Sequence, residues 1–154
     1  MEKKKITITL DGPAASGKST LGEKIAKKLA YVYLDTGVMY RAVTLAAIRH
    51  KIDIDNEKAI TEMAEHLDLQ IQTPSVDDGR SNDILLDKED ITWEIRSEEV
   101  EAHVSKVSTY KGVRVALTNL QRKMGQKGGI VMIGRDIGSV VLPDAEIKLY
   151  LDAS

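Results

Sequence analysis

The sequence lacks cysteine and phenylalanine altogether, and its 154 residues include only three prolines and one tryptophan. Without cysteine, the chain has no disulfide, no thiol nucleophile and no zinc–thiolate site. No apolar run approaches the roughly 20 residues that cross a bilayer, and no secretory leader opens the sequence. The formal net charge of −2 provides no basic excess for a nucleic acid or an anionic membrane. We therefore expect a cytoplasmic protein with neither of these partners.

Hydrophobic periodicity predicts strands that alternate with helices. Apolar runs of strand length occupy residues 6–10, 31–34, 130–133 and 147–151. Between them, apolar residues recur every three or four positions, which is typical of helices with one buried face. These helices are expected over 19–29, 37–49, 60–67, 100–107 and 113–124. Such alternation favours the α/β class with a parallel sheet.

A different pattern begins at Leu69. Three short strand-like runs, LDLQIQ, NDILLD and ITWEI, are separated by residues that are typical of turns. They predict a small antiparallel insertion. The expected organisation is therefore a core formed by residues 1–68 and 109–154, with the insertion at 69–108 between its two parts.

The stretch GPAASGKST lies between the first predicted strand and the first predicted helix, and it matches the phosphate-loop pattern G-x-x-x-x-G-K-S. Its glycines let backbone N–H groups close around phosphates at a helix N-terminus. Lys18 can then neutralise a transferring phosphoryl group, and the Ser19 hydroxyl can ligate Mg²⁺. An ordinary glycine turn is the alternative, and phosphate loops serve kinases, motors and switches alike. The predicted ligands of the ATP phosphates are Gly12, Ala14, Ala15, Ser16, Gly17, Lys18, Ser19 and Thr20.

Two further segments place arginines after predicted strands. In LDTGVMYR, Thr36 lies at a helix start and Arg41 follows about one turn later, so that the helix dipole and a guanidinium can both favour an anion. In IGRDIGSVV, Arg135 and Asp136 follow a buried strand, at the sheet edge where parallel sheets place ligands. A surface ion pair for Arg41 and a structural ion pair between Arg135 and Asp136 are the alternatives.

The motifs GPAASGKST, LDTGVMYR, EIRSEEV with HVSKVS, and GRDIGSVVLPDAE occur in this order. Together they resemble the bacterial cytidylate kinase (CMP/dCMP kinase) family of nucleoside monophosphate kinases, from about residue 4 to the last residue. The resemblance implies ATP-dependent phosphorylation of CMP and dCMP with Mg²⁺. It also implies a P-loop NTPase fold with a three-layer core around a parallel sheet, a lid and an enlarged monophosphate-binding insertion. The predicted antiparallel stretch near 69–96 matches that insertion.

The resemblance also implies roles for single residues. Thr36, Arg41 and Arg135 should hold the CMP phosphate, with Lys18 and Arg135 as catalytic residues. Ser105, Arg114 and Asp136 should face the base. Cytosine offers an amino donor and two acceptors, so that Asp136 and Ser105 can accept while Arg114 donates. Uracil inverts part of this pattern and would leave site groups unpaired. Without the resemblance, a plain helix surface would be the reading for Ser105 and Arg114.

The sequence departs from the family in two ways. Family members carry an acidic residue just before GRD, which helps to place Mg²⁺ through water, whereas this chain has Ile133. Mg²⁺ would then depend on Ser19, the phosphates and Asp35 or Asp136. Family chains also continue for about another third, which supplies the lid arginines and the last core strand. We expect a truncated chain, or one that a partner completes, with reduced activity and a sheet edge prone to self-association, although the family is monomeric.

Three alternatives to CMP kinase activity stay open. Another small-molecule kinase with the same loop would show no preference for cytosine. A nucleotide-binding module without turnover would bind nucleotide and form no CDP. An interaction protein with a vestigial loop would not need Lys18 for nucleotide binding.

Overall fold

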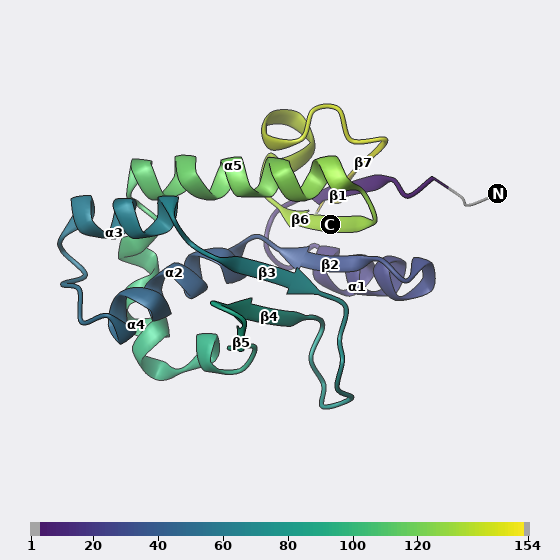
Figure 1. The fold of residues 1–154 in the computed structure, drawn as a ribbon. Coiled ribbons are helices and arrows are strands. Elements are labelled where there is room, and N and C mark those ends of the chain that lie inside the picture. Colours follow the sequence, from purple (N-terminus) through teal and green to yellow (C-terminus); the bar gives the residue numbers. More distant parts are fainter. Residues whose placement is uncertain (1–3, 153–154) are drawn as a thin grey trace.

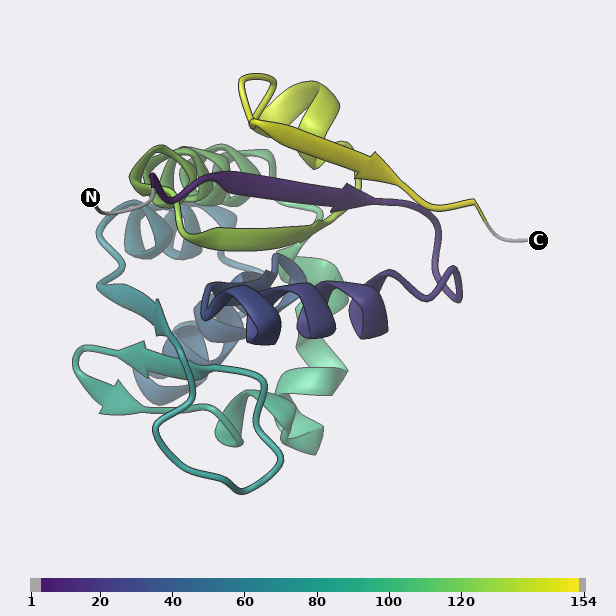
Figure 2. The same ribbon diagram turned by 90° about the vertical axis from the view of Figure 1, so that its right-hand side faces the viewer.

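The computed structural model describes residues 4–152. Its central sheet has four parallel strands in the order β2-β6-β1-β7 (Figures 1 and 2). The strands are β1 (Thr7–Asp11), β2 (Val32–Asp35), β6 (Ile130–Gly134) and β7 (Ile147–Tyr150). β1 and β6 pair in register from Thr7 with Ile130 to Asp11 with Gly134. All four predicted core strands are confirmed, and their carboxyl ends meet at one edge.

Helices cover both faces of this sheet, which gives the predicted three layers. α1 (Lys18–Leu29) lies on one face and α5 (Lys111–Lys127) on the other (Figure 1). The sequence of β1 explains which helix packs on each face of the sheet, because successive strand residues point to opposite sides. Ile8 and Leu10 pack with α1, so the alternate residues of β1 face α5.

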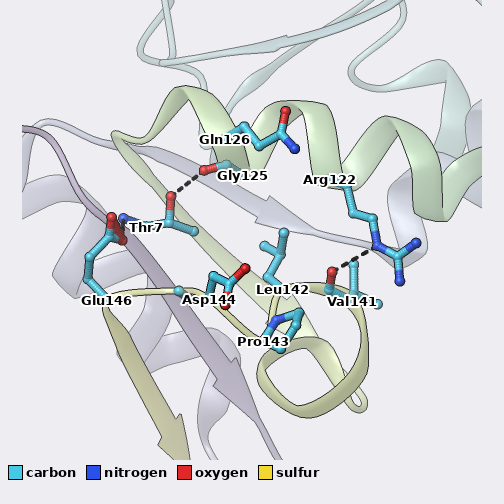
Figure 3. A pocket seen from close by; sticks show the side chains of 10 residues that line it. Thr7, Arg122, Gly125, Gln126, Val141, Leu142, Pro143, Asp144 and Glu146 are labelled. Atoms are coloured by element: carbon cyan, nitrogen blue, oxygen red, sulfur yellow. Dashed lines mark hydrogen bonds between the residues drawn. The ribbon is translucent and has the colours of Figure 1, made fainter.

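The α5-facing side of β1 is polar, although the strand is central. Its residues Thr7, Thr9 and Asp11 are all buried. The Thr7 hydroxyl donates to the Gly125 carbonyl of α5 at 2.5 Å, and the Thr7 amide donates to a Glu146 carboxylate oxygen at 2.8 Å (Figure 3). These bonds satisfy the buried threonine and join β1 to the helix and to the segment before β7.

Three further helices pack against the same core as α5. α2 (Gly37–Arg49) is apolar around most of its circumference and is buried accordingly. α3 (Glu57–Glu65) and α4 (Glu98–Val107) each bury a single face. Side-chain oxygens of Asn56 and Ser97 accept from the first turns of α3 and α4, which are ordinary N-caps. No helix in the described part of the chain is both long and apolar enough to cross a membrane.

The insertion forms a separate antiparallel sheet in the order β3-β4-β5 (Figure 1). Its strands are β3 (Leu69–Gln72), β4 (Asp83–Leu86) and β5 (Glu89–Asp90). The strand predicted for ITWEI is wrong, since Glu94–Arg96 form a 3₁₀ turn, η1. Ile91 and Ile95 are both fully buried, and the Ile95 amide donates to the Ile91 carbonyl. Their spacing of four residues is the period of a helical turn, which overrides the β-branched composition.

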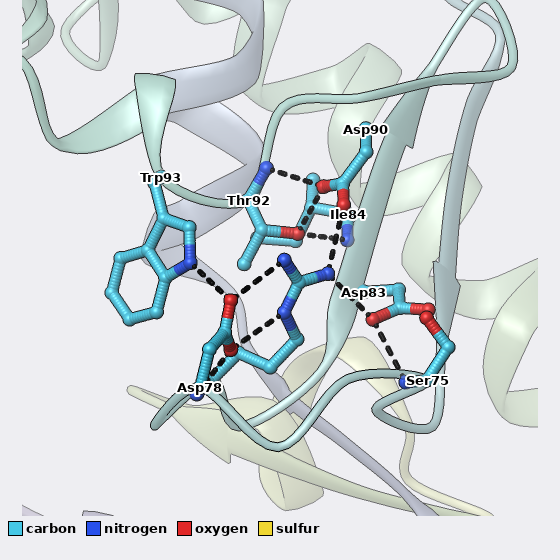
Figure 4. A network of polar contacts seen from close by, with 8 residues as sticks. Ser75, Asp78, Asp83, Ile84, Asp90, Thr92 and Trp93 are labelled. Carbon is cyan, nitrogen blue, oxygen red and sulfur yellow. Dashed lines mark hydrogen bonds and ion pairs between the residues drawn. The ribbon is translucent and has the colours of Figure 1, made fainter.

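One arginine gathers the polar side chains of the insertion. The Arg80 guanidinium, whose side chain is 6% exposed, pairs with Asp78, Asp83 and Asp90 at 2.8–2.9 Å (Figure 4). The Trp93 indole N–H donates to the same Asp78 at 2.9 Å. The network therefore holds the long loop between β3 and β4 against the end of the small sheet.

Candidate functional site

The phosphate loop occupies the turn between β1 and α1. Gly12 and Gly17 take positive φ angles of 155° and 86°, and Ala15 takes 63°. α1 begins at Lys18 with no side-chain cap, so its first amide groups depend on another acceptor. A cavity of about 680 Å³ opens at this helix end. It is lined by residues 14–19 together with Asp35, Thr36, Tyr40, Gly134 and Arg135.

Lys18 lines this cavity. Its ammonium donates to the Gly12 carbonyl at 2.5 Å and to the Gly134 carbonyl at 3.1 Å, which are the ends of the phosphate loop and of β6. The Ser16 hydroxyl is buried and has no hydrogen-bond partner among the described residues. The cavity thus combines a cation, uncapped helix amides and a spare hydroxyl, which suits a phosphate chain.

Two of the predicted phosphate ligands have other positions. Gly12 is buried and does not line the cavity; a Cβ there would lie 2.4 Å from the Leu151 carbonyl oxygen, so only glycine fits. Thr20 is exposed on α1 and does not line the cavity either. The structure brings Ala14, Ala15, Ser16, Gly17, Lys18 and Ser19 together around it.

A second cavity, of about 410 Å³, lies between α2, α5 and the loop after β6. Its lining includes four of the residues predicted for CMP: Thr36, Arg114, Arg135 and Asp136. Thr36, Arg135 and Tyr40 also line the phosphate-loop cavity, so the two cavities adjoin. The two cavities therefore meet at Thr36, Tyr40 and Arg135.

Arg41 and Ser105 do not line either cavity. The Arg41 guanidinium pairs with Glu101 of α4 at 2.6 Å and donates to the Ile95 carbonyl at 3.3 Å. This is the ion pair that the sequence left open as an alternative. Ser105 is exposed on α4.

Arg135 and Asp136 are both exposed, and neither side chain has an ion pair or hydrogen bond within residues 4–152. The structural ion pair between them, considered from the sequence, is therefore not formed in this structure. Both side chains line the second cavity, and Arg135 also lines the phosphate-loop cavity.

The structure adds polar residues that the sequence reasoning missed. Lys111, Thr118 and Asn119 line the second cavity from α5 beside Arg114. Lys111, Arg114 and Thr118 are spaced by three and four residues, which is a readable signal because it places a polar stripe on one face of a helix. Tyr33 lies beneath α1, where burial raises the pKa of its hydroxyl to about 12 against the opposing effect of a hydrogen bond with Ser19.

Ile133, at the position where the family resemblance implies an acidic residue, is fully buried. It packs with Ile8, Leu10 and Ala26 on the α1 face, and a Cβ on Gly22 would lie 3.0 Å from its Cγ2 atom. It offers no oxygen to a metal. Asp35 is the carboxylate that lines the phosphate-loop cavity, with one oxygen accepting from the Gly37 amide at 3.0 Å. The oxygens of Ser19 and Asp35 fit Mg²⁺, which prefers oxygen ligands and retains water.

A parallel sheet whose first strand leads through a G-x-x-x-x-G-K-S loop into an uncapped helix, with a cavity at that point, defines a P-loop nucleotide-binding protein. Within this class, the chain belongs to the cytidylate kinase family, whose family model matches residues 8–154.

Curated relatives agree with the family. A cytidylate kinase of Chloroflexus aggregans is 51% identical over 148 residues, which cover 96% of this chain and 64% of that protein. Cytidylate kinases of Herpetosiphon aurantiacus and Bacillus velezensis are each 48% identical, and the matches cover 65% and 66% of their lengths. The chain therefore spans just under two thirds of the length of these relatives.

Proposed function

We propose that this chain binds ATP and CMP or dCMP in the two adjoining cavities, for phosphoryl transfer that gives ADP and CDP or dCDP. The observation that carries the proposal is the sharing of Thr36, Tyr40 and Arg135 between the phosphate-loop cavity and the second cavity. A phosphate oxygen is already nucleophilic, so transfer depends mainly on alignment and charge neutralisation. Family membership supports the same reaction.

On the donor side, the proposed roles follow the loop geometry. The amide groups at the start of α1 and the Lys18 ammonium bind the β- and γ-phosphates of ATP. Mg²⁺, held by the Ser19 hydroxyl with Asp35 nearby, supplies charge neutralisation when it is bound. Lys18, at the start of α1, and Arg135, directly after β6, line the same cavity and act as the catalytic cations.

On the acceptor side, Thr36 and Arg135 bind the CMP phosphate next to the donor cavity. Deeper along the second cavity, Arg114 donates to the cytosine acceptors and Asp136 accepts from its amino group. Arg41 joins the phosphate only if it leaves Glu101, and Ser105 reaches the base only if α4 moves toward α5.

We further propose that the protein acts in the cytoplasm, and that residues 69–108 are the monophosphate-binding unit between core parts 1–68 and 109–154. The antiparallel sheet of β3, β4 and β5 supports this division, because it is separate from the parallel sheet.

A second candidate function is nucleotide binding without turnover. The buried Ile133 favours it, since an isoleucine cannot orient a water on Mg²⁺. This candidate predicts normal ATP and CMP binding with no CDP under saturating Mg²⁺-ATP.

The test is thermal unfolding with CMP, dCMP, UMP, AMP and dTMP at equal concentration, followed by an assay for CDP with Mg²⁺-ATP. A ligand that binds only the folded chain raises the midpoint according to its affinity. We expect a rise confined to CMP and dCMP.

Two variants test the assigned roles. Asp136→Ala should reduce the preference for cytosine about tenfold, whereas Arg41→Ala should weaken the binding of all monophosphates alike. Equal losses for every base in both variants would contradict the assigned roles, and no rise with any ligand would contradict CMP binding itself.

A further inference from the structure

The carboxylate of Asp11 connects two segments that are 126 residues apart. Asp11 ends β1, directly before the first glycine of the phosphate loop, and is 8% exposed. Its Oδ1 atom accepts from the Ile137 amide at 2.7 Å, and its Oδ2 atom accepts from the Gly138 amide at 2.8 Å. Both oxygens are therefore committed to the backbone that follows Arg135 and Asp136.

These two amides open the short π-helical turn η2 (Ile137–Val141). Asp136 precedes it in the left-handed conformation, with φ at 57°, and its own side chain does not cap the turn. The Asp136 carbonyl accepts from the amides of Val140 and Val141. Asp11 thus takes the place of an N-cap, but from a neighbouring strand instead of from the turn itself.

The η2 turn also fits closely against the polar face of β1, on the same side of the sheet as α5 (Figure 2). A Cβ on Gly138 would lie 2.6 Å from the Thr9 hydroxyl, so a larger residue would displace the turn. That hydroxyl is buried and has no hydrogen-bond partner among the described residues. Contact at Thr9 therefore limits how near the turn comes. Asp11 holds the first two amides of the turn, and Arg122 of α5 donates to the Val140 and Val141 carbonyls at its other end.

Since no side-chain bond or ion pair within residues 4–152 fixes Arg135 or Asp136, their direction depends on the backbone to which they are attached. We propose that Asp11 is a positioning residue for the acceptor site: its buried carboxylate fixes the η2 turn so that Arg135 and Asp136 face the second cavity. The inference rests on the proposed binding of CMP there. It makes the residue before the phosphate loop a determinant of acceptor affinity and base preference, although it touches no substrate.

Asp11→Asn is the sharpest variant, because it keeps the shape and replaces one acceptor oxygen by a donor facing an amide N–H. Thr9→Val is the matched control, being isosteric, on the same face of the same strand and without a hydrogen bond to the turn. Calorimetric titration with CMP, UMP and Mg²⁺-ATP would be run on all three chains. We expect Asp11→Asn to weaken CMP at least tenfold and to narrow the CMP-to-UMP ratio, with Mg²⁺-ATP within about twofold. Thr9→Val should match the wild type.

Amide hydrogen exchange provides a readout without ligand. Exchange at Ile137 and Gly138 should accelerate at least tenfold in Asp11→Asn and stay unchanged in Thr9→Val. If Asp11→Asn does not fold, Gly138→Ala moves the same turn from its other side. That variant should show the same loss of CMP. Thr9→Ala added to it should restore part of the binding, because it removes the contact at 2.6 Å and leaves only the one with the flexible Lys148 side chain at 3.1 Å.

The outcomes separate the two proposals. A wild-type chain without preference for CMP over UMP overturns the proposed function, and the inference with it. A wild-type preference that Asp11→Asn retains overturns the inference alone. Equal losses of Mg²⁺-ATP and CMP in Asp11→Asn would also overturn it, because they would show general structural damage.

Discussion

At the scale of single residues, the hydrogen bonds and ion pairs of a few side chains decide which of them line the phosphate-loop cavity. The Lys18 ammonium is held by two carbonyls at the cavity floor, and Arg41 is held by Glu101 away from it. Ile133 differs from both, because it is a fully buried apolar group directly beneath the helix that carries Ser19. An acidic residue at this position would place a carboxylate under α1, where the chain now has only an apolar side chain.

We predict that Ile133→Asp has opposite effects on stability and on metal use. A carboxylate in this apolar cluster should lower the free energy of unfolding by about 3 kcal/mol in the absence of ligand. Mg²⁺ should then increase ATP affinity at least fivefold more than in the wild type, because the new carboxylate lies under the first turns of α1, where Ile133 now faces Gly22. Denaturant unfolding and titration of ATP with and without Mg²⁺ check both effects. Val131→Asp, on the same face and equally buried, is the control. If it gains the same Mg²⁺ dependence, the position of Ile133 has no special role.

At the scale of elements, a network of charges and hydrogen bonds around Arg80 joins the long loop of the insertion to its small sheet. Three carboxylates raise the pKa of Arg80, so this guanidinium stays charged at any ordinary pH. Hydrogen bonds from Thr92 and Arg80 lower the pKa of Asp90 from 3.8 to about 2. A lowered folded-state pKa stabilises the fold above the unfolded value and loses that contribution as pH falls through the folded value. The network should therefore contribute fully above pH 5 and fail between about pH 4 and 2.

We predict that Asp90→Asn lowers the unfolding midpoint by several degrees at pH 6 and by much less at pH 2, where the Asp90 carboxylate is about half protonated in the folded chain and almost fully protonated in the unfolded chain. Asp87→Asn is the control, since Asp87 lies in the turn between β4 and β5, three residues before Asp90, and takes a φ of 50° that asparagine tolerates. Thermal unfolding of the three chains from pH 2 to 7 measures the effect. A difference at pH 6 that persists unchanged at pH 2 would show that the Asp90 charge is not its origin.

At the scale of the whole molecule, β7 is the least protected strand of the central sheet. It pairs with β1 on one side and ends the strand order within the described residues. Its residues Ile147, Leu149 and Tyr150 are 41%, 37% and 68% exposed. An apolar strand with an unpaired edge favours pairing with another chain.

We predict that the chain self-associates as its concentration rises, and that Leu149→Lys reduces this association at least fivefold, because a charge on an edge strand opposes pairing. Leu29→Lys is the control, since Leu29 is similarly exposed at the far end of α1. Sedimentation velocity over a hundredfold range of concentration checks the prediction. Equal effects of both substitutions would assign association to general hydrophobicity instead of to β7.

Local chemistry explains most of what could be predicted. The four core strands, the phosphate loop and the helix after it depend on period, glycine conformation and the order of elements, which neighbouring residues encode. The proximity of Thr36 and Arg135 could also be predicted. Each follows a parallel strand, and the carboxyl ends of parallel strands lie at the same edge of the sheet. The run ITWEI was misread because its β-branched composition resembles a strand, while its buried pair at Ile91 and Ile95 has helical spacing.

The sequence by itself determined the α/β class, the phosphate loop and the family, since each is carried by residues close together in the chain. Only the tertiary structure decided that Arg41 faces Glu101, that Ile133 packs under α1, and that Asp11 holds the turn behind Asp136. The physical reason is distance along the chain. Each of these contacts joins segments that are at least 60 residues apart or from different layers, so their partners are set by the packing of elements and not by local propensity.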